Sequence, residues 1–130
     1  MRYKLKVYLD TSVISALFDD RNPERKSLTE SFFSEIETFD IYISNITILE
    51  IENTPDKNLK SLMKERIKPF TVLSISEDVE ELVKEIIQKG AIKTSYSEDA
   101  YHIAIALLNE MDFLLSWNFR HIVSKKPKTL

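Results

Sequence analysis

Cysteine is absent from this chain of 130 residues, glycine occurs once, and histidine occurs twice. Without cysteine there is no disulfide framework and no thiolate ligand for a metal. Any bound metal would need oxygen or imidazole ligands, and two histidines make oxygen the favoured donor, which suits hard ions such as Mg²⁺ and Mn²⁺. The single glycine excludes nucleotide binding through a glycine-rich loop.

Long apolar runs are also missing. The segment 1–9 is interrupted by Arg2, Lys4 and Lys6, and its apolar runs are too short for a signal peptide or a membrane span. We therefore expect a cytoplasmic protein with no membrane contact. The net charge of −3 argues against a strong general clamp for nucleic acid. It remains compatible with an acidic centre that has basic residues at its rim.

The hydrophobic residues that are present form regular patterns. They make up 43% of the chain, enough for a core, and the length fits one domain over residues 1–130. Short apolar runs predict strands at 5–9, 41–43, 71–73 and 113–115. Helical periodicity and start signals predict helices at 13–18, 23–39, 44–53, 54–68, 76–89 and 97–110. This alternation predicts a three-layer α/β/α fold around a mainly parallel, four-stranded sheet.

Three acids fall where such folds bind ligands, beyond the carboxyl ends of the strands. Asp10 directly follows the first strand, although a helix cap is the favoured explanation of this residue taken alone. Glu50 shares a helix face with Ile46 and Leu49, where a charge is costly unless a metal, a lysine or an arginine pairs with it. Asp99 lies in the first turn of its helix, where the helix dipole alone favours an acid.

Two neighbours of Asp99 have ordinary structural explanations. Ser95 and Glu98 match a capping box, so Glu98 is expected to be the capping acid. His102, on the same apolar stripe as Asp99, is typical of a hydrogen-bonded core histidine. The joint pattern is more specific, because three carboxylates that meet at one edge repel each other unless a cation neutralises them. A hard divalent ion there would equip the chain for phosphodiester hydrolysis.

Four sequence blocks resemble the PIN domain family, and in particular its VapC-type toxins. They are VYLDTSVI at 7–14, SNITILEI at 44–51, DAYHIAIA at 99–106 and DFLLSWNFRH at 112–121. The resemblance implies an endoribonuclease that depends on Mg²⁺ or Mn²⁺ and acts on RNA. It also implies a toxin–antitoxin pair, with a cognate antitoxin as partner and a homodimer as assembly.

Residue by residue, Asp10, Glu50 and Asp99 match the family's catalytic, metal-binding acids. Thr11 matches the hydroxyl residue that supports the first acid. Ser116 and Asn118 match the last motif, in which many members carry a fourth acid. Asn118 offers a metal ligand without charge, which leaves open whether one or two ions bind. Asp112 precedes the fourth strand and should lie at the opposite end of the sheet.

The carboxyl-terminal tail departs from the family pattern. Members usually continue into a fifth strand, for which the basic tail gives little evidence, so we expect that edge strand to be lost or a partner to cover the edge. Lysines and arginines gather in two clusters, at 57–68 and 120–128. Solvated surface is the ordinary interpretation of both, and Arg120 is the favoured RNA contact because it follows Asn118 closely.

Two other function classes stay open. A PIN-like module could have lost catalysis and bind only RNA or a protein, as the uncharged Asn118 suggests. A phosphotransfer domain that uses a strand-end aspartate ranks last, because Asp10 is followed by Thr11 and Ser12 rather than by a second acid.

Overall fold

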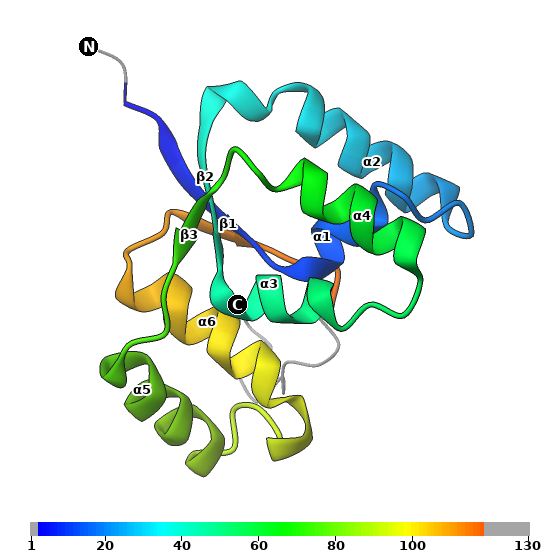
Figure 1. The fold of residues 1–130 in the computed structure, drawn as a ribbon. Helices are drawn as coiled ribbons and strands as arrows, with labels where there is room; N and C mark the ends of the chain where they lie inside the picture. Colours follow the sequence, from blue (N-terminus) through cyan, green and yellow to red (C-terminus); the bar gives the residue numbers. More distant parts are fainter. Residues whose placement is uncertain (1–2, 119–130) are drawn as a thin grey trace, which may run out of the picture.

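A computed structural model describes residues 3–118. Its sheet has the strand order β3-β2-β1-β4, and every pair of neighbours is parallel (Figure 1). The strands are β1 (Leu5–Leu9), β2 (Phe39–Ser44), β3 (Thr71–Leu73) and β4 (Phe113–Leu115). The predicted four-stranded parallel sheet is confirmed. The expectation about a fifth strand concerns residues outside the described range.

Two helices follow each of β1, β2 and β3. They are α1 (Thr11–Ala16), α2 (Pro23–Ser34), α3 (Asn45–Glu52), α4 (Lys57–Arg66), α5 (Glu77–Gln88) and α6 (Ser97–Leu108), with short 3₁₀ turns at Ile36–Thr38 and Thr94–Tyr96. Asn22, Ser44 and Ser76 cap α2, α3 and α5 through their side-chain oxygens. Within residues 3–118, no helix is both long and apolar enough to cross a membrane.

The bounds of three helices and the cap of a fourth differ from the prediction. Helix α1 spans Thr11–Ala16 instead of 13–18. The predicted helix 23–39 ends at Ser34, and a 3₁₀ turn leads from there into β2. The next start lies past Pro55, because Asp56 accepts the backbone N–H of Leu59 and caps α4. The capping box at α6 is wrong: the 3₁₀ turn runs directly into the helix, and no side chain caps it.

The core has two parts, one on each face of the sheet, which confirms the three layers. On one face, alternate residues of β1 and β2 pack against α1, α2, α3 and α4 in a cluster that includes Val7, Leu9, Ile41, Ile43, Phe33 and Met63. On the other face, Tyr8 packs among residues of α5 and α6, such as Val79, Val83, Ala104 and Ile105. Figure 1 shows α5 and α6 together on one side of the sheet, with α1, α2 and α4 on the other.

Helices α1 and α3 matter most for the site. Val13, Ile14 and Ala16 of α1 are buried, so this helix packs into the protein rather than presenting an apolar surface. Helix α3 contributes Ile51 to the first cluster and Ile46 to the second. It therefore lies across the carboxyl edge of the sheet and touches both layers, which fixes the position of Glu50.

The burial of β2 leads to a stability prediction. Ile43 is fully buried, so Ile43→Ala should lower the free energy of unfolding by about 2–5 kcal/mol through lost contacts and an unfilled cavity. Val72→Ala on the edge strand β3 is the matched control; its side chain is 44% exposed, and we expect a loss below about 1 kcal/mol. Urea unfolding followed by circular dichroism measures both. Equal losses would contradict this assignment of the core.

Candidate functional site

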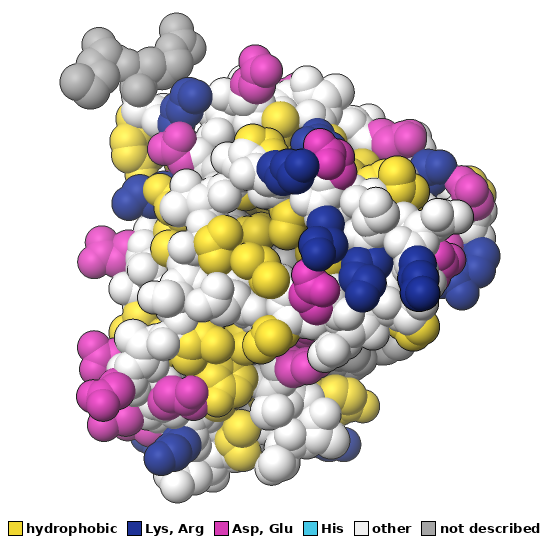
Figure 2. All heavy atoms as spheres, in the orientation of Figure 1, with side chains coloured by type: hydrophobic (Ala, Val, Ile, Leu, Met, Phe, Trp, Pro, Cys, Tyr) yellow, Lys and Arg dark blue, Asp and Glu magenta, His cyan; other side chains and the backbone are white. Residues whose placement is uncertain are grey.

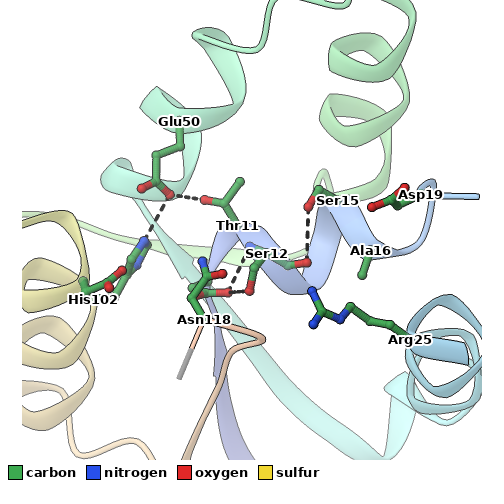
Figure 3. Close-up of a pocket in the computed structure, with 11 residues that line it drawn as sticks. Thr11, Ser12, Ser15, Ala16, Asp19, Arg25, Glu50, His102 and Asn118 are labelled. Carbon is green, nitrogen blue, oxygen red and sulfur yellow. Dashed lines mark hydrogen bonds and ion pairs between the residues drawn. The ribbon is translucent and has the colours of Figure 1, made fainter. Parts of the chain in front are cut away.

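A pocket of about 410 Å³ opens beyond the carboxyl ends of the strands (Figure 3). It is lined by Asp10, Thr11, Ser12, Ser15, Ala16, Asp19, Arg25, Glu50, Asp99, His102 and Asn118. The three predicted acids and Asn118 therefore share one pocket, although they come from four separate segments of the chain. Parallel strands explain this, since all their carboxyl ends meet at the same edge.

Asp10 is both a helix cap and a pocket residue. Its side chain is nearly buried, and Oδ1 accepts the backbone N–H of Ser12 (3.0 Å), the backbone N–H of Val13 (3.4 Å) and the hydroxyl of Ser12 (2.6 Å). The backbone N–H of Asp10 donates to the carbonyl of Leu115 (3.2 Å). The capping and site interpretations of Asp10 are thus compatible, because the hydrogen bonds fix one oxygen of the carboxylate.

Glu50 projects from α3, and among residues 3–118 neither a lysine nor an arginine pairs with it. Instead, the hydroxyl of Thr11 donates to Oε1, and Nε2 of His102 lies 3.1 Å from the same oxygen. Burial raises the pKa of Glu50, but the interactions with His102 and Thr11 outweigh burial and leave the pKa below its usual value. Glu50 is therefore an oriented, ionised carboxylate near neutral pH.

His102 is a core histidine, as expected, and it connects Glu50 to a buried hydrogen-bond chain. Its Nδ1 lies 2.6 Å from the hydroxyl of Tyr8, which lies 2.6 Å from the hydroxyl of Ser44. Because an ionised Glu50 only accepts, Nε2 carries a proton. In the neutral imidazole Nδ1 is then an acceptor, so Tyr8 donates to it and Ser44 donates to Tyr8. Burial raises the pKa of Tyr8, which keeps the phenol protonated.

Glu98 faces the site and does not cap α6. Burial and then the charge of Glu50 raise the pKa of Glu98, so the two carboxyls lie close enough to interact. The expectation that Glu98 is the capping acid is wrong, because the side chain is oriented toward Glu50 instead of reaching back to the helix start. Asp99, next to it, is half-buried and lines the pocket.

The hydroxyl that supports Asp10 belongs to Ser12 and not, as expected, to Thr11. Thr11 donates to Glu50, whereas Ser12 supports the first acid, Asp10. Ser12 also accepts the backbone N–H of Trp117 (2.8 Å), which ties α1 to the segment after β4. Ser116 accepts the backbone N–H of Asn118 (2.9 Å) and thereby shapes that segment. The only sequence signal for Ser12 was the run of hydroxyl residues after Asp10.

Sequence analysis also missed Arg25. This arginine extends from α2 into the pocket, where Figure 3 shows its guanidinium directed toward Ser12. It lies 15 residues beyond Asp10 on a separate helix, so no local motif marks it. The favoured RNA contact, Arg120, lies outside the described residues.

One prediction about a group outside the pocket is confirmed. Asp112 accepts the backbone N–H of Lys6 (2.8 Å) and the hydroxyl of Tyr3 (2.9 Å), which places it at the amino end of β1. The basic residues of α4 lie at the surface, where Figure 2 shows Lys and Arg side chains gathered, and the choice between solvated surface and RNA contact stays a prediction. Among them, Lys60 and Lys64 pair with the exposed Glu52 at 3.9 and 2.7 Å.

The acids share a pocket but do not converge on one point. Among residues 3–118, no group of three His, Asp or Glu side chains is arranged to hold a metal ion. Glu50 is held by His102 and Thr11, while Asp10 and Asp99 line the pocket together with Asn118. The donor chemistry, carboxylate and amide oxygen, is that preferred by Mg²⁺ and Mn²⁺.

Comparisons with known proteins agree with this geometry. A family model described as PIN domain matches residues 7–121, most of the chain. No match is found among curated proteins.

Several solved structures share the fold. A toxin–antitoxin complex from Klebsiella pneumoniae is 22% identical, with 92% of each chain covered and a TM-score of 0.66. VapBC2 from Rickettsia felis, bound to a DNA fragment from its promoter, is 18% identical over 89% of this chain and 90% of that one, with a TM-score of 0.62. VapC20 from Mycobacterium tuberculosis, described as a sarcin-ricin loop cleaving toxin, is 14% identical over 93% and 99%, with a TM-score of 0.68.

The buried chain behind Glu50 leads to a prediction about Tyr8. Tyr8→Phe removes the hydroxyl that bonds to both Ser44 and His102. Each of these buried groups then loses one hydrogen-bond partner, so the free energy of unfolding should fall by about 1–3 kcal/mol. Glu50 still holds the proton on Nε2 of His102, but Nδ1 loses its hydrogen-bond donor, so the nitrogen-15 NMR signal of Nδ1 should shift.

Tyr101→Phe is the matched control for Tyr8→Phe. The hydroxyl of Tyr101 bonds to Glu80 at the surface, so its loss should change stability by less than about 0.5 kcal/mol and leave the Nδ1 signal of His102 unchanged. An unaltered His102 spectrum in Tyr8→Phe would contradict the proposed direction of the chain.

Proposed function

The chain belongs to the PIN domain family, and from that premise we propose that it is a divalent-metal-dependent endoribonuclease that hydrolyses RNA phosphodiester bonds with Mg²⁺ or Mn²⁺. The observation that carries the proposal is the shared pocket of Asp10, Glu50 and Asp99 at the carboxyl edge of the sheet. The described residues that line the pocket include no cysteine and no serine hydrogen-bonded to a histidine. The proposal therefore uses no covalent nucleophile.

Asp10, Asp99 and Asn118 are the residues that would hold the ion, with Glu50 completing the acidic set. They fit it chemically, because all offer hard oxygen donors and the three hydrogen bonds made by the Asp10 carboxylate go to Oδ1. When bound, a divalent ion supplies Lewis-acid polarisation of the phosphodiester and a nucleophilic water at neutral pH.

The chain's own residues prepare the pocket for this chemistry. Ser12 fixes the Asp10 carboxylate from one side, and Thr11 with His102 fixes the Glu50 carboxylate from the other. Because these donors are neutral when His102 is neutral, they orient both acids without cancelling their charges. Glu50 then stays ionised and can complete the oxygen ligand set of the ion.

We further propose that this nuclease is the toxin half of a toxin–antitoxin pair, acts in the cytoplasm, forms a homodimer and is inhibited by a cognate antitoxin. The support is the fold shared with structures described as toxin–antitoxin complexes.

A second candidate is a PIN-like module that has lost catalysis and binds RNA or a protein. The uncharged Asn118 and the lack of a convergent three-ligand group among residues 3–118 favour it. Metal binding separates the two: no Mn²⁺ uptake in calorimetric titrations near millimolar metal would favour the binding module.

The nuclease proposal predicts that Asp10→Asn abolishes Mn²⁺-dependent cleavage of RNA. The loss should be at least about a hundredfold, because a ligand for the ion carries several kcal/mol of transition-state stabilisation. Asparagine also caps helices well, so the fold should persist. Gel analysis of a mixed RNA substrate, with and without EDTA, measures the rate.

Asp112→Asn is the matched control for this substitution. It makes the same chemical change at the opposite end of the sheet, where the acid accepts bonds from Lys6 and Tyr3, and cleavage should be unchanged. Cleavage by Asp10→Asn at the rate of the unaltered chain would refute the nuclease proposal.

The toxin proposal predicts a growth phenotype. Expression of the chain in a bacterial host should arrest growth, Asp10→Asn should not, and co-expression of the product of an adjacent small gene should restore growth. Arrest by Asp10→Asn as well would show that the effect is unrelated to cleavage.

A further inference from the structure

Arg25 is the one arginine or lysine among the described residues that line the acidic pocket. It projects from the first turn of α2, across the pocket from Glu50 (Figure 3). Neither its sequence context nor the match to the PIN domain assigns it a role. An arginine in an acid-lined pocket would ordinarily be expected to pair with one of the acids.

Arg25 is held by an aromatic ring and makes no such pair. Its Cζ lies 4.9 Å from the centre of the Trp117 ring, which is within the range of a cation–π contact. In the described part of the chain, its guanidinium makes neither a hydrogen bond nor an ion pair. The hydrogen bonds of the nearby Asp19 go to Arg21 and lower the pKa of that carboxyl, to which the charge of Arg25 adds a smaller effect from a distance. A cation–π contact does not engage the guanidinium N–H groups with an oxygen acceptor, so they remain available to a ligand.

The Trp117 ring is itself anchored. Its Nε1–H donates to the hydroxyl of Thr29 (3.1 Å), and that buried hydroxyl donates to the backbone carbonyl of Arg25 (2.7 Å). The backbone N–H of Trp117 donates to Ser12, which in turn supports Asp10. Arg25 is therefore positioned relative to Asp10 by a short series of specific contacts.

We propose that Arg25 binds a backbone phosphate of the RNA substrate, adjacent to the phosphodiester that the acids address; this proposal rests on the proposed function. An RNA strand that enters a pocket lined by Asp10, Glu50 and Asp99 meets charge of its own sign. A planar guanidinium with uncommitted donors matches the geometry of a phosphate. The Trp117 stack holds that guanidinium in place before the RNA arrives and reduces the entropy lost on binding.

The test measures RNA binding separately from cleavage. A short, labelled, single-stranded oligoribonucleotide is titrated with the non-cleaving Asp10→Asn chain at several KCl concentrations, and binding is followed by fluorescence anisotropy. Adding Arg25→Ala or Arg25→Gln should weaken binding by about tenfold. The slope of log affinity against log salt should fall by about 0.7, the value for one phosphate contact on a single strand.

Arg66→Ala is the matched control for the loss of charge. Arg66 also stacks on an aromatic ring, with its Cζ 4.6 Å from the centre of Phe33, but it lies outside the acidic pocket. Arg66→Ala should therefore leave both the RNA affinity and the slope of log affinity against log salt unchanged. Arg25→Gln keeps most of the aliphatic stem against Trp117, and circular dichroism establishes that each variant is folded.

Each outcome is decisive. Unchanged affinity and slope in both Arg25 variants would overturn the phosphate contact, as would an equal effect of Arg66→Ala. Weaker binding with an unchanged slope would also overturn it, since no phosphate charge would then be involved.

The unaltered chain's cleavage of RNA is measured in parallel. Cleavage together with unaffected binding in the Arg25 variants refutes this inference alone, whereas a chain that neither binds nor cleaves RNA refutes the proposed function as well.

Discussion

All four described strands run in the same direction, and the position of every functional side chain depends on that constraint. Because β1 and β4 are parallel neighbours, the segments that follow them leave the sheet side by side. The bond from the Asp10 N–H to the Leu115 carbonyl extends their ladder to the end of β1. The bond from the Trp117 N–H to Ser12 then joins the two segments beyond it. Asp10 is thus fixed by its neighbours before any ligand is present.

The pocket keeps its opposite charges apart. An arginine beside Glu50 would have oriented this half-buried carboxylate and also cancelled its charge. Thr11 and a neutral His102 orient it and leave its charge available, and the buried Tyr8–Ser44 pair contacts the other ring nitrogen of His102. Arg25 rests on Trp117 instead of pairing with an acid. Separated charges of both signs suit a ligand that also has both, such as a metal ion with a phosphate.

Local rules were sufficient for much of the fold and for the acids. Periodicity placed all four strands, and capping chemistry placed the starts of α2, α3 and α5, because these signals depend on residues close together in the chain. Helix geometry placed Glu50 on the same face as the buried Ile46, although Leu49, expected on that face as well, is exposed. The partners of Glu50 did not follow from helix geometry: a period of 3.6 residues indicates which face is buried, but not that Thr11 and His102, 39 and 52 residues away, donate to it.

The wrong predictions about the site also arise from contacts between residues that are far apart in the chain, or from local backbone conformation. Glu98 fitted a capping box from local sequence. In the structure a 3₁₀ turn precedes α6, and the Glu98 carboxyl interacts with that of Glu50 instead of capping the helix. Thr11 and Ser12 are adjacent and chemically alike, so only the conformation at the start of α1 decides which one donates to Asp10. Arg25 required the packing of α2 against Trp117, a contact between residues 92 positions apart, which no local pattern encodes.

The central claim is that the acids at the carboxyl edge of the sheet form a binding site for a divalent ion. Paramagnetic broadening of backbone amide signals by Mn²⁺ tests it most directly, because the effect reports position without requiring cleavage. We expect broadening around Asp10, Ser12, Glu50 and Asp99, with none around Lys6 and Asp112 at the other end of the sheet. Broadening centred elsewhere, or none near millimolar Mn²⁺, would contradict the account.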